Sequence, residues 1–487
     1  MKIALNGGEP VRKEFLPFFK PEISNTEIQE VIDTLKSGWI TTGPKTKQFE
    51  EKFAEYIGIK HAIAVSSCTA GLHLALDAIG IRPGDEVITV PYTFCSTANV
   101  IEQMGATPVF VDIDPDTFNI DPSKIEEKIS EKTKAIMPVH FAGHPAEMDE
   151  IMEIARKYNI YVIEDAAHAT ESWYKDHKIG IIGDITVFSF YATKNLCTSE
   201  GGMITTRNDE FAERMRIMSL HGISKDAWKR YGKEGSWFYE VVDCGYKYNF
   251  TDIQASLGIH QLEKLEINNL KRKAVVTKYN EFFSGFEECF IPITKDYVKA
   301  AYHLYPLRID FSKLDCDRKE FISALSSENI GASVHFIPLH TQPYYINKYN
   351  YKKDDFPIAY NEYTKEVSLP LFPSMTENDI NDVCLSVEKI IKFFRKKMSV
   401  IKKIDNKDLN VRSIKAKEYI DERISKIASY FTPEDFDALH TEAEMKVMEL
   451  VLETISIYYE DEADDYVKDN FDKFIDKKII EMSSSVV

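Results

Sequence analysis

The chain has 487 residues, 44% of them hydrophobic, and a formal net charge of −18 at pH 7. That length suggests roughly two to four domains, and the apolar content is enough to build large cores, so a disordered chain is not expected. The negative charge opposes non-specific nucleic-acid binding, which needs a basic face.

The chain start has no apolar run typical of a signal peptide, and no stretch of about 18 apolar residues suggests a membrane span. The seven cysteines are scattered without Cys-x-x-Cys spacing, so we expect neither a metal site nor a disulfide framework. These features together predict a soluble, cytoplasmic protein.

Residues 1–250 alternate short Val- and Ile-rich runs with helical patterns, for example at 71–79 and 148–158. Continuous apolar runs of this length are typical of strands buried on both faces. We therefore predict a large α/β domain around a mostly parallel sheet. The expected strands are 61–66, 86–90, 107–112, 134–139, 161–165 and 185–190.

A smaller α/β domain is predicted for residues 251–396. It begins with a long helical pattern over 251–273. Strands are expected at 302–309 and 331–336, and helices at 318–329 and 376–394.

Residues 400–487 differ from the rest because acidic side chains outnumber basic ones and proline occurs only at Pro433. The apolar spacing predicts three amphipathic helices. One interpretation is a small helical module that buries its own apolar stripes. The other is a set of helices that docks a protein partner or makes an oligomer.

Lys194 is the first candidate for chemistry. It follows the predicted strand 185–190 after the short segment Tyr191-Ala-Thr. A lysine that forms a Schiff base needs its amine near a carbonyl and partly desolvated. Gly201 and Gly202 lie just beyond and permit close backbone approach. A lysine after a strand is usually a surface residue, so other features have to support a reactive role.

Asp165 ends the predicted strand 161–165, and His168 follows three residues later. A carboxylate at the carboxyl end of a central strand lies where open α/β sheets bind ligands. In pyridoxal phosphate chemistry such an acid keeps the pyridine nitrogen protonated. Asp165 could instead cap a following helix. His168 could hydrogen-bond the ring oxygen of the cofactor or be a half-buried helix histidine.

The segment Ser66-Ser-Cys68-Thr69-Ala-Gly follows a predicted strand and opens a helix. Free N–H groups and the helix dipole favour a phosphate there, although an ordinary N-cap looks the same. Phe94, after the next strand, could stack on a pyridine ring or belong to the core. Ser189, five residues before Lys194, could add a hydroxyl to the phosphate.

In this order the segments resemble the DegT/DnrJ/EryC1/StrS family of sugar aminotransferases, over about residues 5–395. Within the family the chain looks similar to the UDP-4-amino-4-deoxy-L-arabinose type, which aminates C4 of UDP-linked keto-sugars. The markers are the segments 37–44, 67–71, 164–169, 188–202 and 245–254, together with His335 and the His340-Thr-Gln segment.

The resemblance implies a fold-type I enzyme that binds pyridoxal phosphate and forms a homodimer with shared active sites. It implies that Lys194 carries the cofactor as a Schiff base, with Asp165 at the pyridine nitrogen and His168 near the ring oxygen. A branch of the family that carries out dehydration has histidine in place of this lysine, so Lys194 argues against that branch. The remaining implied cofactor contacts are Cys68, Thr69 and Ser189 at the phosphate, Phe94 over the ring, and Asn249 reaching the phosphate in the neighbouring subunit.

The predicted reaction moves an amino group from glutamate to a keto-sugar nucleotide, a 4-keto UDP- or dTDP-hexose, for amino-sugar or surface polysaccharide synthesis. Lys194 would also move the proton, and Lys247, His335 and His340 are candidates for contacting the sugar or its pyrophosphate. Two alternatives remain: a pyridoxal phosphate-binding regulator without turnover, and an enzyme of the same fold that acts on a non-sugar substrate.

Overall fold

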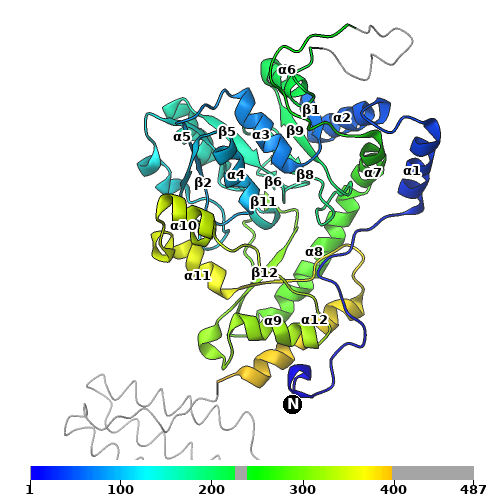
Figure 1. Cartoon of the computed structure of the whole chain (residues 1–487). Coiled ribbons are helices and arrows are strands. Elements are labelled where there is room, and N and C mark those ends of the chain that lie inside the picture. Colours follow the sequence, from blue (N-terminus) through cyan, green and yellow to red (C-terminus); the bar gives the residue numbers. More distant parts are fainter. Residues whose placement is uncertain (1, 225–237, 397–487) are drawn as a thin grey trace, which may run out of the picture. The chain divides into compact units, whose positions relative to one another are not determined.

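The computed structural model describes residues 2–224 and 238–396. A mixed seven-stranded sheet forms its centre, in the order β1-β9-β8-β5-β4-β2-β3 (Figure 1). Six strands are parallel to one another, and β9 is antiparallel to both of its neighbours. The strands are β1 (His61–Val65), β2 (Glu86–Thr89), β3 (Thr107–Phe110), β4 (Thr133–Ile136), β5 (Tyr161–Asp165), β8 (Ile185–Ser189) and β9 (Gly202–Thr206).

The sheet confirms the predicted fold class and all six predicted strands of this region. Successive residues of β5 enter different cores: Val162 joins one apolar cluster, and Ile163 joins the cluster on the opposite face. Burial on both faces explains the continuous apolar runs. The sequence analysis missed β9, whose two polar threonines and initial glycine interrupt the apolar pattern.

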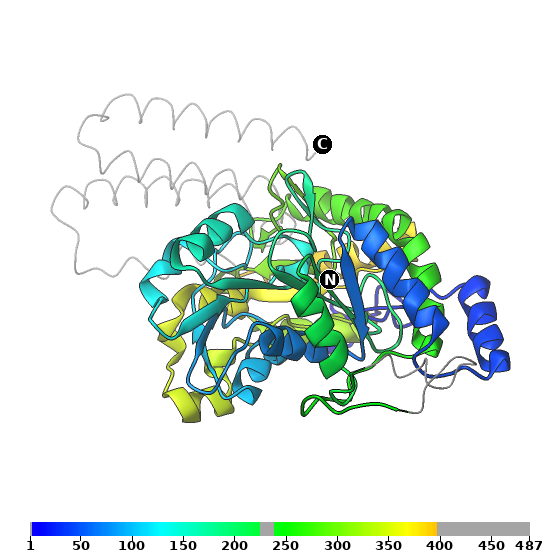
Figure 2. The ribbon, with the colours of Figure 1, turned by 90° about the horizontal axis from the view of Figure 1, so that it is seen from above.

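Helices cover both faces of this sheet (Figure 2). One apolar cluster includes side chains from α2 (Pro44–Ile57), α5 (Met148–Tyr158) and α7 (Asp252–Glu263). The other includes side chains from α3 (Cys68–Ala78), α4 (Cys95–Gln103) and α6 (Asp209–Met218). Helix α3 begins three residues before the predicted start and lies against β8: a Cβ on Gly71 would come within 2.5 Å of Val187.

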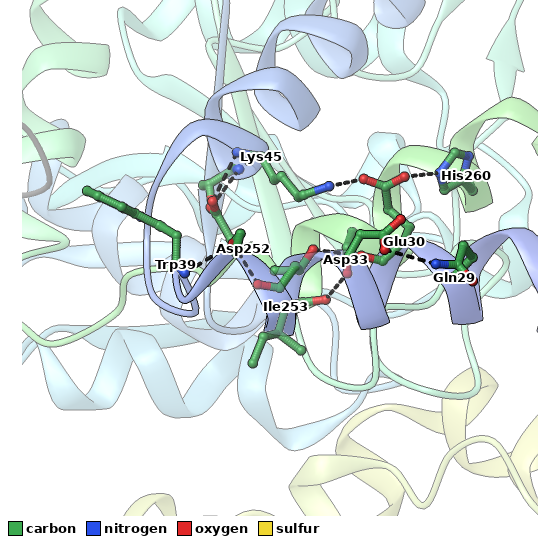
Figure 3. A network of polar contacts seen from close by, with 12 residues as sticks. Gln29, Glu30, Asp33, Trp39, Lys45, Asp252, Ile253 and His260 are labelled. Atoms are coloured by element: carbon green, nitrogen blue, oxygen red, sulfur yellow. Dashed lines mark hydrogen bonds and ion pairs between the residues drawn. The ribbon is translucent and has the colours of Figure 1, made fainter.

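Helix α1 (Asn25–Ser37) is tied to α7 and to the start of α2 by the polar network of Figure 3. Glu30 accepts from Lys45 Nζ, and its Oε2 lies 3.1 Å from His260 Nε2. Asp252 accepts the N–H groups of Lys45 and Thr46 at 3.1 and 2.9 Å, which caps α2. The Asp252 N–H also donates to the Thr41 carbonyl at 3.0 Å, which brings together two distant sequence markers, the segments 37–44 and 245–254.

A second apolar core surrounds a three-stranded antiparallel sheet in the order β10-β12-β13. Its strands are β10 (Cys289–Phe290), β12 (Tyr305–Ile309) and β13 (Glu366–Leu369). The helices of this half are α8 (Leu265–Phe283), α9 (Arg318–Ser327), α10 (Pro343–Tyr349), α11 (Pro357–Lys365) and α12 (Glu377–Phe394). A small sheet joins β11 (Val298–Lys299), β6 (Trp173–Tyr174) and β7 (His177–Lys178).

Two predicted elements within residues 251–396 are wrong. Residues 331–336 form no strand, because β13 pairs with β12, and Ser333 makes only an isolated bridge to Ser368. The predicted helix 251–273 is two helices, α7 and α8, that meet at Lys264, where φ is −105° and ψ is 5°.

Residues up to Lys396 pack as one compact unit, in which apolar residues of α7 belong to the core of the large sheet. A domain boundary near residue 250 stays a prediction. The helices predicted for residues 400–487 lie outside the described residues. Within residues 2–224 and 238–396, no helix has the length and apolar character needed to cross a membrane.

Candidate active site

Lys194 lies in the loop after β8, where its N–H donates to the Tyr191 carbonyl at 2.8 Å. Its side chain is half-buried and makes no hydrogen bond or ion pair with the described part of the chain. Burial lowers the pKa of the Lys194 amine from 10.5 to about 8, although Cys68 and Asp165 act in the opposite direction. The amine is therefore poised to gain and lose a proton near neutral pH.

Asp165 lies at the carboxyl end of β5 and is 3% exposed. Its Oδ2 accepts from the Thr97 hydroxyl at 2.8 Å, and its Oδ1 accepts from the Ala167 N–H at 3.1 Å. Burial raises the pKa of the Asp165 carboxyl, and these two bonds oppose the rise. The capping alternative is not observed, because Asp165 binds the N–H of a turn and no helix follows.

The predicted phosphate turn is the first turn of α3. The Ser67 side chain accepts the N–H of Ala70 and caps the helix. The N–H groups of Cys68 and Thr69 have no acceptor within the helix, because first-turn N–H groups lack one. The Cys68 thiol is buried, and its Sγ lies 3.9 Å from Asp165 Oδ1. The first turn of α3 and the Asp165 carboxylate therefore lie in one site.

Gly202 and Ser189 complete this side of the site, where β9 pairs with β8. A Cβ on Gly202 would lie 2.7 Å from the Cys68 nitrogen and 2.8 Å from the Phe188 carbonyl oxygen. Only glycine therefore lets β9 approach the phosphate turn so closely. Ser189 is buried in the same pair of strands, and its Oγ accepts the Tyr191 N–H at 3.4 Å.

His168 is buried, and its Nδ1 accepts the Ala142 N–H at 3.3 Å. Burial lowers the pKa of His168 well below its usual value, and Lys194 and His335 add to this effect. A neutral imidazole whose Nδ1 accepts must carry its proton on Nε2. The Nε2–H of His168 is therefore free to donate a hydrogen bond, and the His168 ring lies close enough to Lys194 to interact with its charge.

A model of the DegT/DnrJ/EryC1/StrS aminotransferase family matches residues 21–388, a range that contains every one of these side chains. The chain belongs to this family. The sugar aminotransferases of the family bind pyridoxal phosphate, which accounts for a lysine, a buried carboxylate and a helix N-terminus in one site.

Two relatives and one solved structure show how far the likeness extends. An uncharacterized protein of Methanocaldococcus jannaschii is 59% identical over 381 residues, 78% of this chain and 99% of that protein. The spore coat polysaccharide biosynthesis protein SpsC of Bacillus subtilis is 52% identical over 382 residues, which make up 78% of this chain and 98% of that protein. The PMP form of Spr1654 from Streptococcus pneumoniae has a TM-score of 0.74 at 35% identity, with 78% and 99% coverage.

The residues of this aminotransferase fit its cofactor, pyridoxal phosphate. The free N–H groups at the start of α3 and the Thr69 hydroxyl suit a phosphate. The buried Asp165 carboxylate suits a protonated pyridine nitrogen. Lys194 offers an amine without a protein partner, and nothing else in the described site competes for it.

The other predicted contacts fall into two groups. Phe94 is 58% exposed, with its ring centroid 6.0 Å from that of Phe336, and His335 interacts electrostatically with Lys194. The Phe336 ring in turn lies 5.7 Å from the ring of His168, so Phe94 and His335 both lie near the candidate site residues. Lys247 is exposed on the segment that makes a bridge to Leu220. His340 is fully buried, and its Nε2 lies 3.2 Å from the Lys353 carbonyl oxygen, so its contact with a sugar nucleotide stays a prediction.

Asn249 is half-buried beside β1, where it makes a bridge to Val65. Its Nδ2 donates to the Thr42 hydroxyl at 2.8 Å. Within one chain this amide binds the segment 37–44. A contact between Asn249 and the cofactor of a second subunit stays a prediction.

The sequence analysis missed the groups that hold the site in place. Asn195 donates to the Ala301 carbonyl at 2.6 Å, and its Oδ1 lies 3.1 Å from His303 Nδ1. The His303 ring lies 4.3 Å from the ring of His168. These contacts could not be predicted from the local sequence, because Asn195 lies 106 residues from Ala301 and 108 residues from His303.

Proposed function

We propose that this aminotransferase moves an amino group from glutamate to a keto-sugar nucleotide, such as a 4-keto UDP- or dTDP-hexose. The family match and the similarity to SpsC, a spore coat polysaccharide biosynthesis protein, support a sugar substrate. The observation that carries the proposal is the half-buried Lys194 amine, with a pKa of about 8, in one site with the Asp165 carboxylate and the first turn of α3.

Bound pyridoxal phosphate supplies a carbonyl that takes up the amino group and a ring that withdraws electrons. Lys194 would carry the cofactor and then act as general base and general acid. Asp165 would hold the proton of the pyridine nitrogen, since Thr97 and Ala167 fix its carboxylate. His168 would donate its Nε2 proton to the ring oxygen, and Cys68, Thr69 and Ser189 would hold the phosphate.

We also propose a cytoplasmic homodimer in which Asn249 reaches the phosphate of the cofactor bound by the neighbouring subunit. In one chain the aromatic side chain of Tyr191, three residues before Lys194, is 47% exposed, which supports its cover by a second copy. Lys247 and His335 are our candidates for contacts with the sugar nucleotide.

The test incubates the purified enzyme with glutamate and a panel of keto-sugar nucleotides, and mass spectrometry identifies any amino sugar. We expect one or more 4-keto compounds to be aminated and 2-oxoglutarate to appear in equal amount. Glutamate alone should release a single equivalent of 2-oxoglutarate, whereas a non-catalytic regulator would release none. Lys194→Ala should lose both the visible absorbance of the lysine-bound cofactor and all turnover.

A further inference from the structure

Glu366 on β13 is a fully buried carboxyl that has no ion pair within residues 2–224 and 238–396. Its Oε2 accepts the N–H of His335 at 2.9 Å, and its Oε1 accepts the hydroxyl of Ser368. A buried carboxyl with these partners is either a costly charge or a site that holds a proton.

Ser368 links this carboxyl to an imidazole. Its Oγ lies 2.9 Å from His335 Nδ1. Because the serine proton points to Glu366, Nδ1 of His335 must donate to Ser368, and the lone pair of this neutral ring is on Nε2. Glu366, Ser368 and His335 therefore form a continuous hydrogen-bonded chain.

The imidazole end of this chain faces the active-site residues. Burial and the Lys194 ammonium lower the pKa of His335 to about 4. The Phe336 ring lies 5.1 Å from the ring of His335 and 5.7 Å from that of His168. Nε2 of His335 has no hydrogen-bond partner among the described residues, and the ring is only half-buried. Tyr92, whose hydroxyl donates to the His335 carbonyl at 2.8 Å, holds the backbone.

We propose that Glu366, Ser368 and His335 form a proton relay that supplies a proton to a ligand bound beside Lys194. When Glu366 is protonated, its O–H donates to Ser368, Ser368 donates to Nδ1 of His335, and Nε2 carries the ring proton. Delivery moves one proton across each link: Nε2 gives its proton to the ligand, Nδ1 takes one from Ser368, and Ser368 takes one from Glu366. The carboxyl ends ionised, and His335 is neutral before and after.

The surroundings of Glu366 suit this cycle. Burial raises the pKa of Glu366 to about 8, opposed by the bonds from Ser368 and the His335 N–H and by the charge of Arg318. Arg318 on α9 is engaged elsewhere, since it donates to the Tyr363 carbonyl. On β12, Arg308 pairs in register with Glu366, but its Nη1 lies 3.1 Å from Glu362. The carboxyl can therefore load and release a proton near neutral pH.

The identity of the acceptor rests on the proposed function. Amination of a ketone releases the ketone oxygen as water, so a proton has to reach that oxygen. Lys194 handles the proton on carbon, and a second donor separates the two tasks. His335 supplies that donor without becoming a cation, which its low pKa disfavours.

The first test needs no sugar substrate. Diethyl pyrocarbonate modifies the unprotonated nitrogen of a neutral imidazole, and peptide mass spectrometry measures His335 labelling in the holoenzyme relative to exposed His177. We expect the ratio to rise with pH around 8 as Nε2 loses its proton. Glu366→Gln should keep the ratio low at every pH, because the amide NH₂ donates to Ser368 while its oxygen accepts the His335 N–H. A flat ratio in the wild type, or an unchanged rise in Glu366→Gln, would overturn the relay.

The second test measures kinetics with an aminated substrate. Glu366→Gln and Ser368→Ala should lower kcat about tenfold or more and remove the pH dependence near 8, with the KM for glutamate unchanged within about twofold. Ser368→Thr keeps the hydroxyl and should restore both. The matched control is Glu288→Gln, which removes a buried carboxylate paired with Arg395 and should keep the wild-type pH profile. Equal profiles in Glu366→Gln and Glu288→Gln would refute the relay even if the sugar substrate is correct.

Discussion

The Thr97 hydroxyl donates a 2.8 Å hydrogen bond to Oδ2 of Asp165, and both side chains are almost fully buried. Thr97 comes from α4 and Asp165 from β5, so the bond joins two elements separated by 68 residues. It holds the carboxylate in position and opposes the rise in pKa that burial imposes. The charge of Asp165, our candidate acid for the cofactor, therefore depends on a neighbouring helix.

Thr97→Val should weaken cofactor binding about tenfold or more at pH 7, since a hydrogen bond to a charged group contributes about 1.5–3 kcal/mol. The pKa of Asp165 rises further without this bond, so affinity should fall at a higher pH than in the wild type as the carboxylate protonates. Spectroscopic titration with pyridoxal phosphate between pH 5 and 8 measures both effects. Thr97→Ser keeps the hydroxyl and serves as the control. Equal titrations for the valine and serine variants would contradict this role.

Asp165→Asn should lower the pKa of Lys194 below its value of about 8, because the Asp165 carboxylate favours the charged amine. Competitive acetylation of the cofactor-free enzyme, followed by mass spectrometry of the Lys194 peptide, gives the pH at which the amine becomes reactive. The wild-type midpoint is expected near pH 8 and the variant midpoint at lower pH. A shift to higher pH would show that the two groups are not coupled as the structure indicates.

Lys194→Met should stabilise the cofactor-free protein at pH 7 by at most about 3 kcal/mol, because the native state no longer holds a half-buried ammonium. The folded pKa of Lys194 is about 8 and the ordinary value is 10.5, so between these pH values the unfolded chain binds more protons. The free energy of unfolding of the wild type should therefore rise with pH across that window relative to Lys194→Met. The difference in stability between the two proteins should close. Urea unfolding at pH 7 and at pH 10 measures the gap, and a constant gap would disprove the pKa shift.

Gly202→Ala should displace the phosphate turn, since its Cβ would lie 2.7 Å from the Cys68 nitrogen. We expect at least a tenfold loss of cofactor affinity and a stability loss of about 1–3 kcal/mol. Gly285→Ala is the matched control, because its Cβ would meet only the Phe282 carbonyl oxygen, at an ordinary 3.5 Å. Calorimetric unfolding with and without pyridoxal phosphate compares the two. A normal cofactor-induced stabilisation in Gly202→Ala would argue against phosphate binding at this turn.

Local pattern predicted the large sheet well because its strands are buried on both faces and read as apolar runs, as in β5 and β8. It failed where pairing depends on distant partners. Strand β9 carries threonines and glycine yet lies between β1 and β8, and residues 331–336 look like a strand although β13 occupies the place beside β12. Strand pairing depends on which segments become neighbours in the folded chain, so it cannot be predicted from one short segment alone.

The sequence by itself predicted the candidate residues of the site, because the order of its motifs resembles the sugar aminotransferase family: Lys194 as the reactive amine, Asp165 as the acid and the turn at Cys68 and Thr69 as the phosphate site. Only the tertiary structure decided how they are controlled. Desolvation lowers the pKa of Lys194, Thr97 holds Asp165, and Glu366 reaches His335 through Ser368. Burial and hydrogen bonding arise from residues far apart in the chain, and folding alone brings them into contact.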